Sequence, residues 1–409
     1  MLKNYLKIAI AVLKRRKFFT FISLFGISFT LTILLVLTAF IDKVVGDNYP
    51  DRKRDRSLYI NRVEEKGKES MSSSNPSYYF LNHFAGGMKT PVQMTIFSGF
   101  SGTNTYINNK KIAVDYKYTD AAYWDILEYE FLEGKPFNAL QVSNADRVAV
   151  ISEDMKKEYF GDEPSVIGKY IEADNVKYKV TGVVKDIPIT SYMTYSQIYL
   201  PFTLSKTDYK NKGYLGHSMA ILLGKSSADV PKMKTEYEQI ISRIPVEDKK
   251  MFDHLYSHAN TYISSYVDTG NESQSGIVIV LSVLGTFVFL FMLLPTLNLV
   301  NINITRIMER SSEIGVRKAF GASSKTLVYQ FIVENIVLTL LGGIIGLILS
   351  EIVIMILNNA NLIANLELSL NFTVLFVGLL ICLIFGLLSG VYPAWRMSKL
   401  NVVTALKAQ

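Results

Sequence analysis

The chain has a single cysteine, Cys382, so no disulfide can form within it. Histidine is also scarce: there are four in 409 residues. His254 and His258 stand four positions apart, where a helix could present both to one metal ion. No HExxH pattern and no evident third ligand accompany them, so a plain surface pair is favoured. The sequence therefore predicts no metal site and no cofactor bound by this chain.

Motifs for catalysis and for nucleotide binding are missing as well. No Gly-x-Ser-x-Gly elbow is present. The segment that comes nearest to a phosphate loop has Gly161 and Gly168 too far apart, and Lys169 is followed by Tyr170 where Mg²⁺ binding needs Ser or Thr. The sequence predicts no catalytic residue and no ATP hydrolysis by this chain on its own.

The formal net charge of +7 first suggests an anionic partner, but its distribution argues against nucleic acid. Residues 43–275 carry 29 Lys+Arg and 30 Asp+Glu. The excess lies beside apolar runs instead: six basic residues in 3–17, five in 306–325 and three in 396–407. This pattern is typical of membrane flanks.

Four long apolar runs predict transmembrane helices at 18–41, 276–305, 326–357 and 371–395. The first contains 24 residues and would extend about 36 Å as a helix, enough to cross a hydrocarbon core of about 30 Å. It is too long for a signal peptide and no small-residue cleavage site follows it, so we expect a retained anchor.

All the basic flanks fall on one side of these four runs. By the positive-inside rule, the amphipathic N-terminus (1–17), the loop 306–325 and the tail 396–409 are predicted to be cytoplasmic. The large domain 42–275 and the loop 358–370 are then extracytoplasmic. The chain is expected to be a multi-pass protein of the bacterial inner membrane, in a 1+3 helix arrangement.

Small residues recur at four-residue spacing in the last two runs, which predicts close helix packing in lipid. They are Gly342, Gly346 and Ser350, followed by Gly378, Cys382, Gly386 and Gly390. Glu334 is the one acid well inside a span. It either has an intramembrane role or pairs with a basic neighbour near the cytoplasmic end.

Residues 42–275 read as a mixed α+β domain. Strands are expected at 57–63, 92–97, 111–118, 147–151 and 219–223, with a hairpin turning at Asp174-Asn175. Ser152 is expected to cap a helix, 231–244 to form another, and Asn75-Pro76 to open a third. The serine-rich stretch 70–74 reads as a flexible surface loop.

Four segments resemble a known family. The stretch 301–346, NINITRIMERSSEIGVRKAFGASSKTLVYQFIVENIVLTLLGGIIG, is similar to the core of the MacB/FtsX-like ABC transporter permeases in their four-helix, separate-ATPase form. The C-terminal stretch GVYPAWRMSKLNVVTALK (390–407) resembles the end of the same family. Residues 123–137 and 148–188 resemble its extracytoplasmic domain.

The resemblance implies a fold, partners and an activity. The outer domain would be of the MacB periplasmic-core type, with an inserted β-rich lobe at about 119–215. Two permeases, identical or different, would each bind a cytoplasmic ATPase that holds ATP and Mg²⁺. Membrane lipid, and in some systems a periplasmic adaptor and an outer-membrane channel, would be further partners.

The loop 306–325 is expected to contact that ATPase. If 312–320 is helical, Glu313 and Arg317 pair at i, i+4, while Val316 and Phe320 form an apolar ridge that Gly321 ends. The plain alternative is a loop that only fixes topology. The residues assigned to coupling are Glu309, Arg310, Glu313, Ile314, Gly315, Arg317, Lys318, Phe320 and Gly321.

Three functions stay open at this point. The first is efflux or export of antibiotics, peptides or amphiphiles, driven from the cytoplasm. The second is release of lipoproteins from the membrane, and the third is FtsX-like signalling that regulates an extracytoplasmic enzyme.

Overall fold

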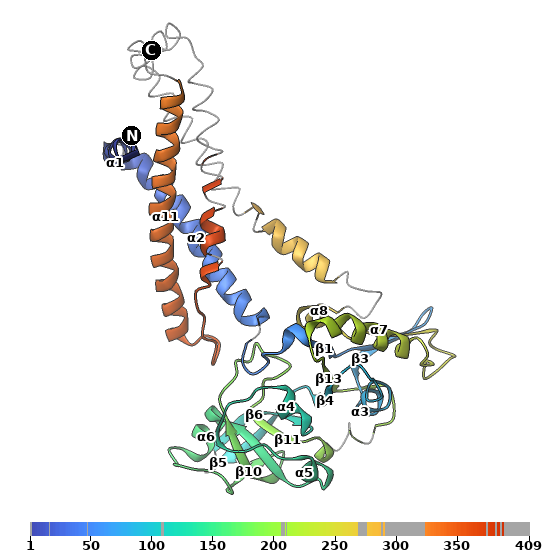
Figure 1. Ribbon diagram of the computed structural model, residues 1–409. Coiled ribbons are helices and arrows are strands. Elements are labelled where there is room, and N and C mark those ends of the chain that lie inside the picture. Colours follow the sequence, from blue (N-terminus) through green and yellow to red (C-terminus); the bar gives the residue numbers. More distant parts are fainter. Residues whose placement is uncertain are drawn as a thin grey trace. The chain divides into compact units, whose positions relative to one another are not determined.

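The computed structural model describes residues 2–15, 17–46, 48–107, 110–205, 209, 211–268, 276–287, 289–290, 324–373, 375–380, 383–384 and 387. The chain divides into two compact units (Figure 1). The helical unit comprises Met1–Lys43, Ser282–Leu362 and Glu367–Gln409. The α+β unit comprises Val44–Leu281 and Ile363–Leu366.

The helical unit is built on long apolar helices. Helix α1 spans Leu2–Arg15, α2 spans Lys17–Val45 and α11 spans Ser324–Ala360. Two segments within the described residues are long and apolar enough to cross a membrane: Lys17–Val44 and Ile332–Ala360, with mean hydropathies of 2.4 and 2.6. They coincide with the first and third predicted spans. The other two predicted spans lie largely outside the described residues, so the 1+3 arrangement stays a prediction.

The α+β unit is organised around a ten-stranded mixed sheet with the order β1-β13-β4-β6-β11-β8-β10-β7, to which β5 and β9 add at β6 and β10. The pairs β6–β11 and β8–β10 are parallel and the rest antiparallel. The strands are β1 Ser57–Ile60, β4 Gln93–Ser98, β5 Ser101–Ile107, β6 Lys110–Thr119, β7 Phe131–Gly134, β8 Val148–Ser152, β9 Tyr170–Ala173, β10 Val176–Val184, β11 Ile198–Pro201 and β13 Ser218–Leu223.

A second sheet has four strands in the order β12-β3-β2-β14. Its strands are β2 Val63–Lys66, β3 Met71–Pro76, β12 Leu215–Gly216 and β14 His254–Ser257. The helices of the unit are α3 Tyr78–Phe80, continued by a wider turn over Leu81–Ala85, then α4 Ala122–Ile126, α5 Ala139–Ser143, α6 Glu153–Phe160, α7 Val230–Ile241 and α8 Tyr262–Tyr266. Short 3₁₀ turns occupy Arg54–Arg56, Phe202–Leu204 and Ser227–Asp229.

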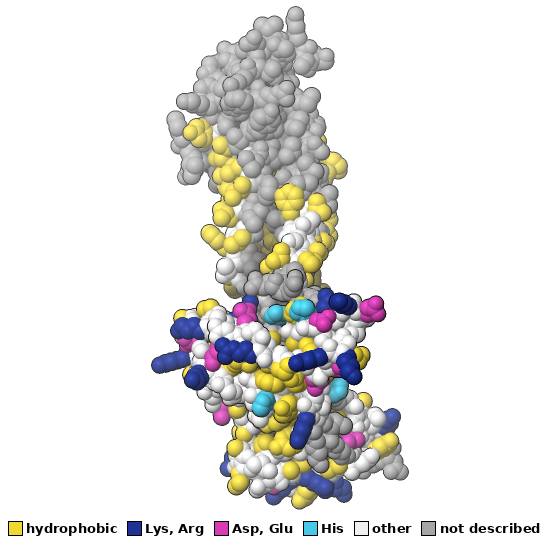
Figure 2. All heavy atoms as spheres, turned by 90° about the vertical axis from the view of Figure 1, so that its right-hand side faces the viewer, with side chains coloured by type: hydrophobic (Ala, Val, Ile, Leu, Met, Phe, Trp, Pro, Cys, Tyr) yellow, Lys and Arg dark blue, Asp and Glu magenta, His cyan; other side chains and the backbone are white. Residues whose placement is uncertain are grey.

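Helix α7 illustrates how the sequence builds the core. Pro231 lies in its first turn, where a missing N–H costs no hydrogen bond. Met233, Tyr237 and Ile241 follow at four-residue spacing, so they share one face. That face is buried with apolar residues of β1 and β13. On the face shown in Figure 2, charged side chains are dispersed over the α+β unit, while the side chains drawn for the described part of the helical unit are mainly hydrophobic.

Most predicted elements of this unit are confirmed. Strand β8 coincides with 147–151, α7 with 231–244, and the Ser152 hydroxyl accepts a hydrogen bond from the Met155 amide at the start of α6. The hairpin turns at Asp174 and Asn175, whose φ angles of 49° and 58° are the left-handed pair that a tight two-residue turn needs. The mixed α+β class is confirmed.

Two local predictions are wrong, and one local possibility raised by the sequence is excluded. Residues 71–74 are not a flexible loop, because they form strand β3 between β2 and β12. Asn75 and Pro76 end that strand, and the helix begins two residues later, capped by the Ser77 hydroxyl. His254 lies on strand β14 and His258 follows that strand, so the two histidines do not share a helix face.

Candidate functional site

The residues assigned to the ATPase contact lie outside the described residues. All nine, from Glu309 to Gly321, fall within 291–323. Helix α11 begins just after them at Ser324. The coupling assignment therefore stays a prediction that rests on the sequence.

Helices α2 and α11 pack closely at the glycines of α11. A Cβ atom added to Gly342 would lie 2.7 Å from the Ile27 Cγ2 atom. One added to Gly346 would lie 3.0 Å from the Leu31 Cβ atom and 3.0 Å from the Ser28 carbonyl oxygen. Only a residue without a side chain fits at such distances, so these two glycines let the backbones approach.

One hydroxyl group, that of Thr32, also bridges the same two helices. The Thr32 hydroxyl donates to the Ser28 carbonyl at 2.7 Å, within α2, and lies 3.2 Å from the Gly346 carbonyl of α11. The Ser350 hydroxyl donates back to the same Gly346 carbonyl at 2.8 Å. In an apolar environment, these hydrogen bonds give the hydroxyl groups partners that water cannot supply.

The remaining small-residue positions are only partly described. A Cβ atom on Gly378 would lie 3.1 Å from Leu31 and 3.2 Å from Leu34, so this part of the last predicted span also lies against α2. Cys382, Gly386 and Gly390 fall outside the described residues.

Glu334 is buried on α11, with 1% of its surface exposed, next to the buried Asn335. Helix α11 begins at Ser324, so Glu334 lies ten residues further along it, inside the predicted span 326–357. Thr339, slightly further along, is buried too. This part of α11 thus contains three buried polar residues, Glu334, Asn335 and Thr339.

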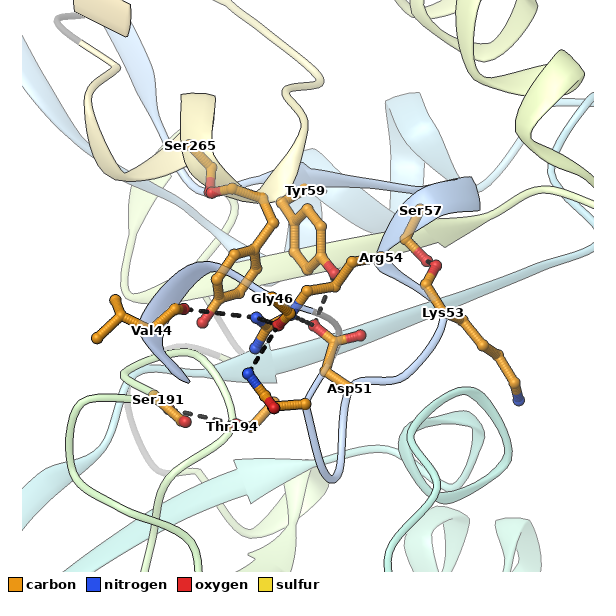
Figure 3. A network of polar contacts seen from close by, with 12 residues as sticks. Val44, Gly46, Asp51, Lys53, Arg54, Ser57, Tyr59, Ser191, Thr194 and Ser265 are labelled. Carbon is orange, nitrogen blue, oxygen red and sulfur yellow. Dashed lines mark hydrogen bonds and ion pairs between the residues drawn. The ribbon is translucent and has the colours of Figure 1, made fainter. Parts of the chain in front are cut away.

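The α+β unit begins with a buried polar cluster that sequence reasoning missed (Figure 3). We call Asp51, Arg54, Tyr59 and Tyr262 the Arg54 cluster. Asp51 and Arg54 are only 1% and 7% exposed, and the Arg54 Nε atom lies 3.2 Å from the Asp51 Oδ2 atom. The Tyr59 hydroxyl donates to the same carboxylate oxygen at 2.6 Å.

Arg54 also holds the end of helix α2. Its Nη1 atom lies 3.5 Å from the Val44 carbonyl oxygen and donates to the Gly46 carbonyl oxygen. Val44 belongs to the last turn of α2, where backbone carbonyls have no partner within the helix. A guanidinium is well placed there, because a positive charge favours the C-terminal end of a helix.

Aromatic rings enclose the cation. The Arg54 guanidinium carbon lies 3.4 Å from the centre of the Tyr262 ring, which meets the Tyr59 ring edge-on at 5.3 Å. Burial, and then the adjacent Asp51 carboxylate, raise the pKa of the Tyr59 hydroxyl well above its usual value, so it stays protonated and donates. Tyr59 lies on β1, and β1 pairs with β13 in the large sheet.

The cluster therefore joins the last turn of α2 to the first strand of the sheet. A buried ion pair adds little net stability by itself. Removing one partner is strongly destabilising, however, because the other charge is left buried without compensation, so the pair holds the two side chains in one arrangement. The sequence analysis singled out no residue of this cluster.

The two histidines that stand four positions apart in the sequence lie on and just after strand β14. Within the described residues, no group of three or more His, Cys, Asp or Glu side chains could hold a metal ion. His254 is exposed and stacks on Tyr256, with ring centres 6.0 Å apart.

Comparison with known proteins gives two family matches in chain order. A family model described as MacB-like periplasmic core domain matches residues 20–240, and one described as FtsX-like permease C-terminal matches residues 285–402. The first alone covers more than half of the chain.

Individual relatives are similar at low identity. An uncharacterized ABC transporter permease, YknZ of Bacillus subtilis, is 25% identical over 70% of this chain and 68% of its own length. The macrolide export ATP-binding/permease protein MacB of Salmonella choleraesuis is 22% identical over 98% of this chain, but the match spans only 59% of that longer protein. The periplasmic region of MacB from Actinobacillus actinomycetemcomitans has a solved structure that matches 54% of this chain and 94% of its own, at 15% identity and a TM-score of 0.38.

Proposed function

The chain belongs to the FtsX-like ABC transporter permeases with a MacB-like periplasmic core domain, and from that premise we propose that it is the permease subunit of an exporter. A separate cytoplasmic ATPase binds ATP and Mg²⁺, and the permease conveys the resulting movement to its outer domain. The cargo is an antibiotic, a peptide or another amphiphile in or beyond the inner membrane.

The observation that carries the proposal is the order of the two family matches along the chain. The periplasmic-core match includes α2 and most of the α+β unit, and the permease match includes α11 and the predicted coupling loop. A large domain placed between the first apolar span and the later ones suits a protein that works on the outer side of a membrane. Export is supported further by the Salmonella relative, which is named as a macrolide export protein.

The described contacts suggest how movement travels. The predicted loop 306–325 leads directly into α11, so a push on the loop would move that helix. The α2–α11 contact at Gly342 and Gly346 is too close for the helices to slide without separating. A displacement of α2 then reaches its last turn, where Arg54 holds the Val44 carbonyl and β1 follows.

The proposal also specifies how two permeases would cooperate. Each would carry one ATPase, in a homodimer or a heterodimer, with both termini and the coupling loop in the cytoplasm. A periplasmic adaptor and an outer-membrane channel would complete the path where the organism has an outer membrane.

The decisive experiment is reconstitution with the partner ATPase. The purified permease should not hydrolyse ATP until that subunit is added. Phe320→Ala should weaken their association, because truncating a buried interface aromatic costs on the order of 2 kcal/mol or more. Gly321→Val should disturb the turn that ends the predicted loop helix, because a β-branched residue resists positive φ.

A matched control is Phe18→Ala, since Phe18 is an exposed aromatic at the start of α2. It should leave association and ATP turnover unchanged. If both loop variants bind and stimulate the ATPase like the wild type, the loop only fixes topology and the coupling assignment is wrong.

A further inference from the structure

The C-terminal part of helix α11 lines an open groove. The groove has a volume of about 830 Å³, within the range of sites that hold drug-sized molecules. The segment 368–372 lines it as well, and all its lining residues belong to the helical unit. The Asn358 side chain joins these two parts: its Nδ2 atom donates to the Leu368 carbonyl oxygen, and its Oδ1 atom accepts from the Leu368 amide, both at 2.9 Å.

The lining of the groove is mainly apolar. On α11 it includes Ile348, Ile352 and Met355, which share one face of the helix at spacings of four and three residues and are all exposed. The segment 368–372 adds Phe372, which is 71% exposed. These side chains leave the groove open to an apolar guest.

One carboxylate interrupts this apolar lining. Glu351 is exposed and lines the groove. Among the residues that the structure describes, it forms no hydrogen bond and no ion pair. No Lys, Arg or His is among the described residues of the lining, and none occurs in the sequence between Lys325 and Arg396. This part of the chain thus supplies a negative charge and no cation of its own.

The position of Glu351 along α11 indicates its level in the membrane. The sixteen residues between Glu334 and Glu351, 335–350, carry no charge. As a helix they extend about 24 Å, most of a hydrocarbon core of about 30 Å. Because residues 358–370 are predicted to be extracytoplasmic, Glu351 is expected near the outer boundary of that core. An amphiphile in the outer leaflet holds its charged head at the same level.

We propose that this groove binds a single-chain cationic amphiphile, whose ammonium group pairs with the Glu351 carboxylate while its hydrocarbon chain packs on Ile352 and Met355. A charge-assisted hydrogen bond fixes the head, and burial of the apolar chain adds affinity. An anionic amphiphile would instead bring a second negative charge next to Glu351. The inference rests on the proposed export function and deepens it, because it assigns a positive charge to the cargo.

The test measures equilibrium binding of two tritiated probes, n-decylammonium and the neutral 1-decanol, to the full-length permease in nanodiscs of zwitterionic lipid. Binding to empty nanodiscs is subtracted, so partition into lipid does not count. The ammonium should bind saturably, and the alcohol at least about tenfold more weakly, because it lacks the charge that pairs with Glu351. Since neither ATP nor an ATPase is present, failed binding overturns this site alone, whereas failed reconstitution with the ATPase overturns the export proposal.

Three variants identify the groups responsible. Glu351→Gln keeps the size of the side chain and removes its charge, so it should weaken n-decylammonium binding about tenfold and leave 1-decanol binding unchanged. Met355→Ala removes apolar surface and should weaken both probes several-fold. Glu367→Gln is the matched control: it neutralises an exposed acid that does not line the groove and should have no effect.

A second copy of the chain is the competing occupant of the groove. Native mass spectrometry separates the two, because a ligand site predicts the same oligomeric mass for Glu351→Gln and for the wild type. A change in oligomeric state would show that a second copy occupies the groove and would overturn the proposal. It is also overturned if n-decylammonium does not bind saturably, if 1-decanol binds equally well, or if Glu351→Gln leaves ammonium binding unchanged.

Discussion

Replacing Arg54 by alanine should destabilise the α+β unit by about 3 to 5 kcal/mol, the usual cost of removing one partner from a buried ion pair. Asp51 would keep its charge in a site where only 1% of its surface is exposed. The Val44 and Gly46 carbonyls would lose their guanidinium donor, and the Tyr262 ring would lose its cation.

A double variant separates the charge from the packing. Arg54→Met together with Asp51→Asn removes both charges and keeps most of the volume. Replacing a buried pair by neutral groups of similar size is often nearly neutral, so much of the stability should return. For a unit of this size, the single variant should lower Tm by about 6 to 20 °C.

The assay can report on this unit alone. The chain has two tryptophans, Trp124 and Trp395, and Trp124 lies in the core of the α+β unit. In a Trp395→Phe background, the fluorescence of full-length permease in detergent then follows the unfolding of that core. Arg52→Ala removes an exposed neighbouring charge and should leave the transition unchanged. A loss below about 1 kcal/mol for Arg54→Ala, or equal losses for the single and double variants, would refute the reasoning.

Three other predictions test separate contacts. Gly346→Ala should lower the thermal stability of the permease in detergent, because the new Cβ atom would lie 3.0 Å from the Leu31 Cβ atom, whereas Gly26→Ala, where nothing lies within 4 Å, should not. Lys117 is fully buried, which lowers the pKa of its ammonium group well below the usual value. Lys117→Met should therefore raise the free energy of unfolding at neutral pH. In this variant the free energy of unfolding should also increase less as the pH rises on the alkaline side. Burial raises the pKa of Asp120 to about 6, so the folded state keeps a proton that the unfolded state loses near pH 4. The free energy of unfolding, measured by urea titration, should therefore fall by up to about 3 kcal/mol as the pH rises from about 4 to 6. In Asp120→Asn the free energy of unfolding should depend less on pH across this range.

The parts of the fold with local signals were predictable from the sequence. The Asp174-Asn175 turn, the Ser152 cap and the spacing of Met233, Tyr237 and Ile241 each follow from contacts within a few residues. The long apolar segments of α2 and α11 likewise predict membrane spans, and this prediction needs no knowledge of the remainder of the fold.

Elements that depend on distant partners were not predictable. Strand β3 is rich in serine and has no apolar alternation, and it is a strand because β2 and β12 bond to its two edges. The Arg54 cluster was not predictable for the same reason. Asp51 and Arg54 lie in a charged stretch of the kind usually found at the surface, and Tyr262 is 208 residues beyond Arg54 in the sequence. Only the folded sheet brings these groups together and excludes water.

The central claim is that ATP-driven movement reaches the outer domain through the end of α2. Hydrogen–deuterium exchange of the reconstituted permease–ATPase complex, with and without ATP, tests it most directly. We predict that peptides covering residues 44–60 change their exchange when ATP is added, and that the change is lost in the Arg54→Met/Asp51→Asn variant although ATP is still hydrolysed. Unchanged exchange across the whole α+β unit during ATP turnover by the wild type would contradict the account.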